Sequence, residues 1–295
     1  MNIYHEQSKN VWKTWFLMIM FFAVIIGIGF GFAQAYNNSI ILYIAVGFSF
    51  FMNIFSYWYS DKIVLKMYKA QEVTNESHPD LYNSVENLCI TAGLPLPKIY
   101  VIPDAAPNAF ATGRNKNHAA VAFSSGLLQM LNKSELEGVI AHELSHIGNR
   151  DILISTIVVV LVGFVSILAD MFLHGAMWGG MNRDDDSKGN AISVIIGIAL
   201  AILAPLAVTV IQLAISRKRE YLADASGALL TRYPEGLASA LEKISSYNRP
   251  MNHATQATAH MFIANPFGGL GKRAAGLFAT HPPAEDRIRI LRGMK

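Results

Sequence analysis

Three long segments of the chain contain no Asp, Glu, Lys or Arg. The first runs for 47 residues between Lys13 and Asp61, the second for 18 residues over Ile152–Ala169, and the third for 26 residues over Ala191–Ser216. A helix at the surface of a soluble core keeps one polar face toward water, so segments like these are not typical of soluble proteins. Charged residues make up only 15% of the chain, against about 25% in an average soluble domain. The sequence therefore predicts an integral membrane protein.

The charge-free segments predict four membrane-spanning helices. A helix rises about 1.5 Å per residue and needs about 20 residues to cross the hydrocarbon core. The first segment is long enough for two crossings, and its only polar interruption is Tyr36–Ser39, so we expect a helical hairpin there. A cleaved signal peptide fits this segment less well, because its apolar part is too long and lacks a small-residue cleavage site. The expected spans are Trp15–Ala35, Ile40–Tyr59, Ile152–Phe172 and Ala191–Ser216.

Basic residues flank the expected spans on one side of the membrane. The first connecting loop carries no charge, and the second carries Asp184–Asp186 against Arg183 and Lys188. The positive-inside rule therefore places both termini and the long polar segments in the cytoplasm. Basic residues beside spans also bind anionic lipid headgroups, and the net charge of +3 comes with no nucleic-acid-binding motif. We expect contact with the lipid bilayer and no nucleic-acid partner. The flanking residues are Lys9, Lys13, Lys62, Lys66, Lys69, Arg150, Arg217, Lys218 and Arg219.

The spans divide the chain into four parts. We expect an N-terminal membrane hairpin in residues 1–60, the first half of a cytoplasmic domain in 61–151, a second membrane hairpin in 152–216, and the second half of the domain in 217–295. The two cytoplasmic halves hold 91 and 79 residues, which is enough for one domain with its own core. The single cysteine, Cys89, excludes an internal disulfide and is expected to be buried.

Local patterns predict a mixed helix and strand structure for residues 61–151. Proline, glycine and β-branched residues mark the ends and interiors of the expected elements. These are a helix over Pro79–Gly93, a strand over Pro97–Pro103, a hairpin of Asn108–Gly113 with His118–Phe123, and a helix opened by a capping box at Ser134–Glu137.

The helix after this capping box carries the string His142-Glu143-Leu144-Ser145-His146. Histidines at i and i+4 lie on one helical face and can bind one metal ion, and imidazole nitrogens suit Zn²⁺. Glu143 lies beside the first histidine, where it can reach a water on the metal without binding the metal itself. The string favours zinc-dependent hydrolysis over an ordinary salt-bridged helix.

A catalytic zinc site requires a third protein ligand. One known extension of the string has Gly and His where Asn149 and Ile152 stand here, so the ligand must come from elsewhere. The best candidate lies in Arg219–Asp224, where Glu220 and Asp224 are again spaced i and i+4. We assign Glu220 as the ligand and Asp224 as the acceptor that orients a ligand histidine. The reverse assignment remains open, as does a pair of solvated acids facing nearby basic residues. Packing of the third and fourth spans would bring the two halves of the site together.

A last group of polar residues lies in Thr280–Arg287. His281 precedes two prolines and is able to donate a hydrogen bond to a developing oxyanion, and Arg287 lies at the start of a basic helix. A solvated loop before an amphipathic helix explains the same residues equally well. Three other histidines lack useful spacing and are expected to be ordinary core or surface residues, namely His118, His253 and His260.

Four motifs resemble those of the HtpX-type membrane zinc metalloproteases, which are relatives of the CAAX prenyl proteases. The motifs occur in the family's order, with two expected spans before the first and two between the second and third. The resemblance covers essentially the whole chain. The matching stretches are NAFATGRN from Asn108, HELSHIGNRD from His142, REYLADASGA from Arg219 and THPPAEDRI from Thr280.

The resemblance implies a zinc metalloendopeptidase of the bacterial inner membrane that hydrolyses misfolded or damaged membrane proteins in quality control and the stress response. With the spans, it implies a mainly α fold: a four-span helical membrane protein with a cytoplasmic α+β, gluzincin-like domain carrying a small β-hairpin or sheet. It also implies one Zn²⁺ per chain. The implied roles are metal binding by His142, His146 and Glu220, general base catalysis by Glu143, and support from Asp224, His281 and Arg287.

Two other classes of protein remain as alternatives. A transporter, or a scaffold with a non-proteolytic zinc site, would explain the spans but not the retained Glu143 or the motifs. Polar residues at mid-membrane, which transporters use, are almost absent from three of the spans. For a protease, we expect His118–Phe123 to be an edge strand that pairs with an extended substrate. Substrate preference is expected to vary in Asn182–Asn190 and Tyr247–Gly271.

Overall fold

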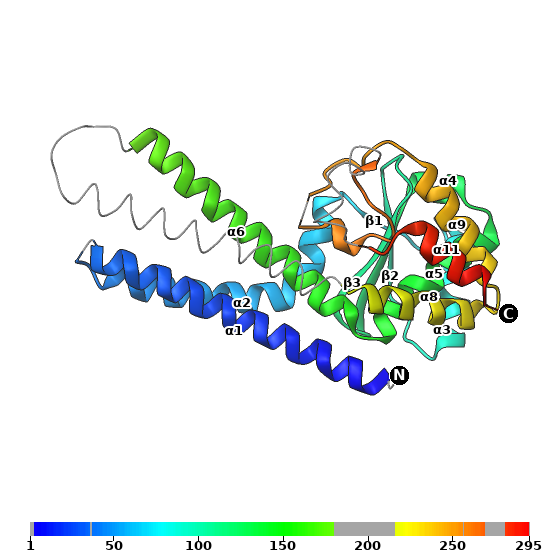
Figure 1. Ribbon diagram of the computed structural model, residues 1–295, viewed down its shortest axis with the longest axis horizontal. Coiled ribbons are helices and arrows are strands. Elements are labelled where there is room, and N and C mark those ends of the chain that lie inside the picture. The colour runs from blue at the N-terminus through cyan, green and yellow to red at the C-terminus, as the bar shows by residue number, and fades with distance from the viewer. Residues whose placement is uncertain (1–2, 36, 180–215, 256, 269–280, 295) are drawn as a thin grey trace. The chain divides into compact units, whose positions relative to one another are not determined.

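The computed structural model describes residues 3–35, 37–179, 216–255, 257–268 and 281–294 (Figure 1). The chain forms two compact units. A polar unit comprises Met1–Val11, Asp61–Thr156 and Ala214–Lys295, and an apolar unit comprises Trp12–Ser60 and Ile157–Leu213. The acidic loop Asn182–Asn190 and the expected fourth span, except Ser216, lie outside the described residues.

Among the described residues, three long helices contribute to the apolar unit. They are α1 (Ile3–Ala35), α2 (Ile40–Met67) and α6 (Asp151–Gly179), and each extends into the polar unit at one end. Within the apolar unit, the ring centroid of Phe164 lies 5.8 Å from that of Phe21 and 5.0 Å from that of Phe48. All three helices therefore pack together through aromatic side chains.

The described residues contain two helices that are long and apolar enough to cross a membrane, Asn10–Gln34 and Ile40–Met67. A third crossing is present if the helix Lys133–Gly148 and the segment Asp151–Ile167, which meet at an angle of 85°, are counted as one bent span. The prediction of two N-terminal spans thus has matching helices, and α6 covers the expected third span. Helices α1 and α2 both extend beyond the boundaries expected for their spans.

The polar unit contains a four-stranded mixed sheet in the order β1-β2-β4-β3. Strand β2 pairs in parallel with β4, and the other two pairs are antiparallel. The sequence predicted β2 and the β3–β4 hairpin but not the two-residue strand β1. The strands are β1 (Gln71–Glu72), β2 (Lys98–Ile102), β3 (Ala109–Asn115) and β4 (His118–Ser124).

The prediction that His118–Phe123 forms the edge strand is wrong. Strand β4 lies between β2 and β3, and β3 is the outer strand. The local sequence of a hairpin does not determine which of its strands faces the rest of the sheet. Here that choice is made by the long-range pairing of Lys98 with Ala120 and of Ile102 with Ser124.

Helix α5 (Lys133–Gly148) packs against the sheet and several helices of the polar unit. The other helices in the described part of the chain are α3 (Pro79–Ala92), α4 (Ser125–Met130), α8 (Arg217–Thr231), α9 (Pro234–Ser246), the short 3₁₀ helix η1 (Ala259–Met261) and α11 (Ala284–Arg292). The apolar residues Ile140, Leu144 and Ile147 of α5 belong to one buried cluster with residues of β2, β4, α3 and α9. Helices α9 and α11 lie side by side (Figure 1).

The capping box of α5 differs from the predicted one. Asn132 is the N-cap residue: its Oδ1 accepts from the backbone N–H of Glu135 at 3.0 Å, and Glu135 Oε2 accepts from the backbone N–H of Asn132 at 2.9 Å. The prediction that Ser134 and Glu137 form the box is therefore wrong. Both pairs have the same spacing, and Asn caps a helix as well as Ser does. The structure starts α5 at Lys133, two residues earlier than the predicted box would start it.

Candidate metal centre

His142 and His146 lie on one face of α5, and their side chains converge. The Nε2 atoms of His142 and His146 are 3.1 Å apart. His142 is fully buried, and burial lowers its pKa to about 4. The imidazole of His142 is therefore neutral near pH 7, which is the form that binds a metal.

Glu220 comes to these histidines from α8. Its Oε2 lies 3.8 Å from His142 Nε2 and its Oε1 lies 3.7 Å from His146 Nε2. Helix α8 can approach α5 closely because position 227 is glycine: a Cβ there would meet the backbone nitrogen of His142 at 3.0 Å. The close packing of two helices thus joins residues separated by 74 positions in the sequence.

The donor set fits a zinc ion. Ligand atoms of His142, His146 and Glu220 all lie within 4.8 Å of one another. Bonds of about 2.0–2.1 Å in a tetrahedral site place ligand atoms about 3.3 Å apart. The two histidine nitrogens are close to this separation at 3.1 Å, and their distances of 3.8 and 3.7 Å to the two oxygens of Glu220 are somewhat longer. Two imidazoles and one carboxylate also leave a fourth position open, as in a catalytic zinc site.

An aspartate and an arginine lie beside the Nδ1 atom of His142, on the side of the ring away from Glu220. Asp224 Oδ1 is 3.0 Å from His142 Nδ1. Arg287 donates to both carboxylate oxygens of Asp224, at 2.7 and 2.8 Å, and to the carbonyl of Ile263 at 2.9 Å. Burial alone would raise the pKa of Asp224, but Arg287 and His142 lower it to about 2. Asp224 is therefore a carboxylate that accepts from the ring nitrogen of His142 facing away from Glu220.

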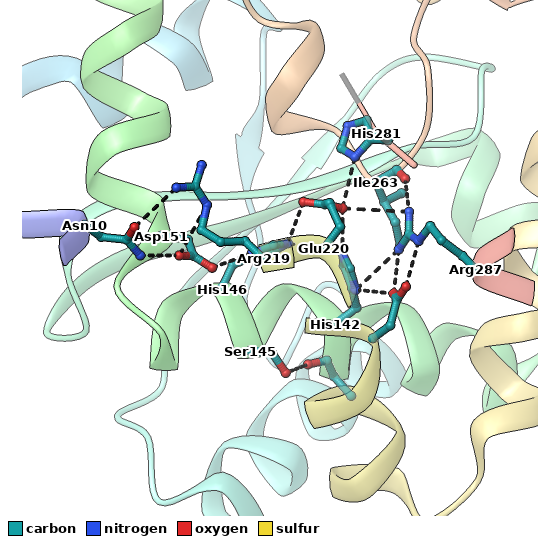
Figure 2. Close-up of polar contacts among 12 residues, drawn as sticks. Asn10, His142, Ser145, His146, Asp151, Arg219, Glu220, Ile263, His281 and Arg287 are labelled. Carbon is teal, nitrogen blue, oxygen red and sulfur yellow. Dashed lines mark hydrogen bonds and ion pairs between the residues drawn. The ribbon is translucent and has the colours of Figure 1, made fainter. Parts of the chain in front are cut away.

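A second aspartate lies behind His146. Asp151 Oδ2 is 3.1 Å from His146 Nδ1, and Asp151 is itself contacted by Asn10 and Arg219 (Figure 2). Burial alone would lower the pKa of His146, but Asp151 and Glu220 raise it to about 9. Below that pH, His146 must release a proton when it binds a metal.

The contact between Asp151 and His146 was not predicted. No motif in the sequence assigned Asp151 to the site. The one available signal is its position five residues after His146, just past a break at Arg150, whose φ is 59°. This left-handed residue turns the chain so that the first residue of α6 reaches back to α5.

Glu143 faces the same cavity as the three candidate ligands. It is 1% exposed, and its Oε2 has no hydrogen-bond partner among the described residues. Burial raises the pKa of the Glu143 carboxyl to about 7. A carboxyl group with this pKa can accept and return a proton near neutral pH.

His281 enters the site from the segment before α11. Its Nδ1 lies 3.0 Å from Glu220 Oε2, and its Nε2 is buried without a hydrogen-bond partner among the residues described here. The structure thus brings His281 and Arg287 to the centre together with the residues of α5 and α8. The preceding residues 269–280, including Thr280, lie outside the described chain.

His260 also lines the cavity, which no sequence pattern predicted. It lies in η1, is 7% exposed, and donates from Nε2 to the carbonyl of Ser155 at 3.1 Å. Burial lowers its pKa to about 4. No spacing relates His260 to the other site residues, because the chain reaches the cavity through an irregular segment.

Comparisons with known proteins identify the family. The model of peptidase family M48 matches residues 75–295. The chain belongs to peptidase family M48. Its matched region includes α5, α8 and α11, which carry the site. The protein is a metallopeptidase, a hydrolase that acts on peptide bonds.

Relatives of this M48 peptidase are similar over most of their length. A protease HtpX homolog from Thermoanaerobacter pseudethanolicus is 46% identical over 297 residues, covering 99% of this chain and 98% of the relative. Homologs from Desulforapulum autotrophicum and Pyrococcus furiosus are 54% and 48% identical over 251 and 282 residues, covering 84% and 95% of this chain and 80% and 94% of the relatives. The resemblance to HtpX-type proteases noted from the motifs is confirmed.

A solved structure shares the fold of the M48 peptidase. The crystal structure of S. mikatae Ste24p aligns with a TM-score of 0.51 at 19% identity, covering 95% of this chain and 66% of that one. At this identity the similarity concerns the fold alone. The protein is thus a mainly helical membrane metallopeptidase with a small mixed sheet and a fold like that of Ste24p.

Proposed function

We propose that this M48 peptidase is a zinc-dependent endopeptidase that cleaves misfolded or damaged membrane proteins at the cytoplasmic face of a bacterial inner membrane. The observation that carries the proposal is the convergence of His142, His146 and Glu220 beside the buried Glu143. A transporter or a scaffold would not require a buried carboxyl group with a pKa near 7 next to a metal site.

In this proposal, His142, His146 and Glu220 hold one Zn²⁺ per chain. When bound, Zn²⁺ supplies Lewis-acid polarisation of a peptide carbonyl and an acidified water as nucleophile. Asp224 and Asp151 accept hydrogen bonds from the outer nitrogens of the two histidines and fix their ring orientations. Arg287 keeps Asp224 charged and in place.

Glu143 moves the proton. Its unpartnered Oε2 accepts a proton from the attacking water and then passes it to the departing amine nitrogen. His281 has a buried Nε2 that is free to donate to the developing oxyanion, while its Nδ1 stays with Glu220.

Strand β3 is the better candidate for substrate pairing. It is the outer strand of the sheet, and its Ala111 lines the cavity together with Glu143. An extended peptide that pairs with β3 would place its carbonyl groups beside the metal centre. This proposal replaces the expectation that β4 performs the role.

The test of catalysis compares wild type with Glu143→Gln on an unfolded protein substrate, with and without a chelator. We expect Glu143→Gln to lose about 10²–10⁴-fold in cleavage rate, because general base catalysis contributes about this much. Zinc content should stay unchanged, since Glu143 is not a ligand. Full cleavage by Glu143→Gln, or by chelated wild type, would refute the proposal.

The third ligand is tested separately by metal analysis. We expect Glu220→Gln to purify without zinc and Asp224→Asn to retain zinc with weakened affinity. Retained zinc in Glu220→Gln and lost zinc in Asp224→Asn would reverse the assignment of the two acids.

A further inference from the structure

We infer that Asn10 is a positioning residue for the metal centre, through which helix α1 holds Asp151 against His146. The inference rests on the proposed function, because it concerns a ligand of the proposed zinc ion. Asn10 lies on α1, far from the site in sequence, and the motifs that identify the family do not include it.

The contacts form a short chain of hydrogen bonds (Figure 2). Asn10 donates from Nδ2 to Asp151 Oδ1 at 2.6 Å, and Asp151 Oδ2 lies 3.1 Å from His146 Nδ1. Arg219 donates from Nη1 to Asn10 Oδ1 at 3.2 Å, and its Nε lies 3.6 Å from Asp151 Oδ1. Each oxygen of Asp151 therefore faces a different side: one faces Asn10 and Arg219, and the other faces the proposed ligand.

An amide is suited to this position. Asn10 uses its NH₂ group toward a carboxylate and its carbonyl oxygen toward a guanidinium, and neither leucine nor aspartate offers both. Asn10, Asp151 and Arg219 are 2%, 3% and 7% exposed. Water therefore does not readily replace a missing partner, and loss of the amide leaves a buried charged group short of a hydrogen bond.

Asn10 lies near the start of α1, where a candidate membrane span begins. Asn10 is the first residue of the candidate membrane span Asn10–Gln34. Within α1, the residues up to Val11 belong to the polar unit and the residues from Trp12 onward belong to the apolar unit. The first turns of α1, which belong to the polar unit, thus help to hold His146 in its orientation.

The test measures Zn²⁺ affinity of the full-length protein in detergent by competition with a chromogenic chelator. Substituting a direct hydrogen-bond partner of a ligand histidine lowers metal affinity by about 10–100-fold. Asn10 contacts such a partner and not the histidine itself, so we expect Asn10→Leu to lower Zn²⁺ affinity by about 5–10-fold. Asn10→Ala removes the amide without adding an apolar group, and should give the same result if leucine disturbs folding. The turnover number on a peptide should fall, while KM stays unchanged.

Two further variants distinguish an effect on the position of His146 from a general loss of protein stability. Lys243→Met removes the 2.7 Å contact of Lys243 with Glu135 at the other end of α5, and should lower thermal stability with unchanged Zn²⁺ affinity. In an Asp151→Asn background, Asn10→Leu should cause little additional loss of affinity, because its effect passes through the Asp151 carboxylate.

The outcomes distinguish this inference from the proposed function. Wild-type Zn²⁺ affinity in folded Asn10→Leu and Asn10→Ala, together with loss of binding in His146→Ala, overturns the positioning role alone. Wild-type protein that binds no Zn²⁺ overturns the proposed function and this inference with it.

Discussion

Each histidine of the metal centre is backed by an aspartate, and each aspartate by an arginine. His142 contacts Asp224, which Arg287 binds through both carboxylate oxygens. His146 contacts Asp151, whose Oδ1 lies 3.6 Å from Arg219. A buried carboxylate needs such a partner, because an unpaired buried charge costs several kcal/mol. The arginines therefore allow two carboxylates to lie beside the ligands without losing their charge.

We predict that Arg287→Met strongly destabilises the protein. The substitution leaves Asp224 buried without its main partner, and breaking a buried ion pair in this way costs about 3–5 kcal/mol. Thermal unfolding in detergent should show a large fall in midpoint. The control is Arg292→Met on the same helix, which removes only exposed ion pairs to Glu235 and Glu242 and should change the midpoint much less. Equal effects of the two substitutions would contradict the buried pair's role.

The single cysteine should be almost unreactive in the folded protein. Cys89 is 2% exposed, and burial, together with the charge of Glu86, raises the pKa of its thiol to about 11. At pH 8 only about one molecule in a thousand carries the reactive thiolate. Maleimide labelling should therefore be slow until denaturant is added, whereas a cysteine introduced as Lys116→Cys in the exposed β3–β4 turn should react quickly. Rapid labelling of native Cys89 would show that α3 opens readily.

The sequence supports some residue-level predictions better than others. The spacing of His142 and His146 places both on one face because helix periodicity is a local property. The burial of Cys89 was predicted for the same reason, from the apolar face of its helix. The contacts of Asp151 with Asn10 and of His260 with the cavity connect distant segments without any shared period. Nothing in the local sequence signals them.

At the scale of elements, the site depends on how closely α5 and α8 approach each other. Gly227 lies two turns after Glu220 and faces the backbone of Ala141 and His142. Helices with a small residue at the contact can pack with short interaxial distances, because no Cβ separates the two backbones. The sequence predicted both helices, but their contact distance follows from tertiary packing. The choice of β3 over β4 as the outer strand has the same origin.

We predict that Gly227→Ala weakens metal binding without unfolding the protein. The added Cβ would meet the backbone nitrogen of His142 at 3.0 Å, so α8 must shift by a few tenths of an ångström and carry Glu220 away from the histidines. Zn²⁺ affinity, measured by chelator competition, should fall. Gly148→Ala at the end of α5 is the matched control, since its Cβ meets only Leu94 Cδ1 at 3.9 Å. Comparable losses in both variants would rule out the helix contact as the cause.

At the scale of the whole molecule, the polar unit restricts the membrane topology. It contains Met1–Val11, Asp61–Thr156 and Ala214–Lys295. A compact unit lies on one side of a membrane, so each intervening segment must cross an even number of times. Helices α1 and α2 are two candidate crossings for the first segment. In the second segment α6 covers the expected third span, and the expected fourth span, Ala191–Ser216, lies outside the described residues except for Ser216.

This topology predicts which positions are accessible from outside the cell. We expect Ser39→Cys, between α1 and α2, and Asp185→Cys, in the acidic loop, to react with a membrane-impermeant maleimide in intact cells. Lys116→Cys should react only after lysis, because we propose from the basic flanks that the polar unit faces the cytoplasm. Native Cys89 need not be replaced in the three variants, because it is buried and should not react with the maleimide. Labelling of Lys116→Cys in intact cells would show that the polar unit faces outward. Protection of Asp185→Cys alone would contradict the prediction of a second membrane hairpin.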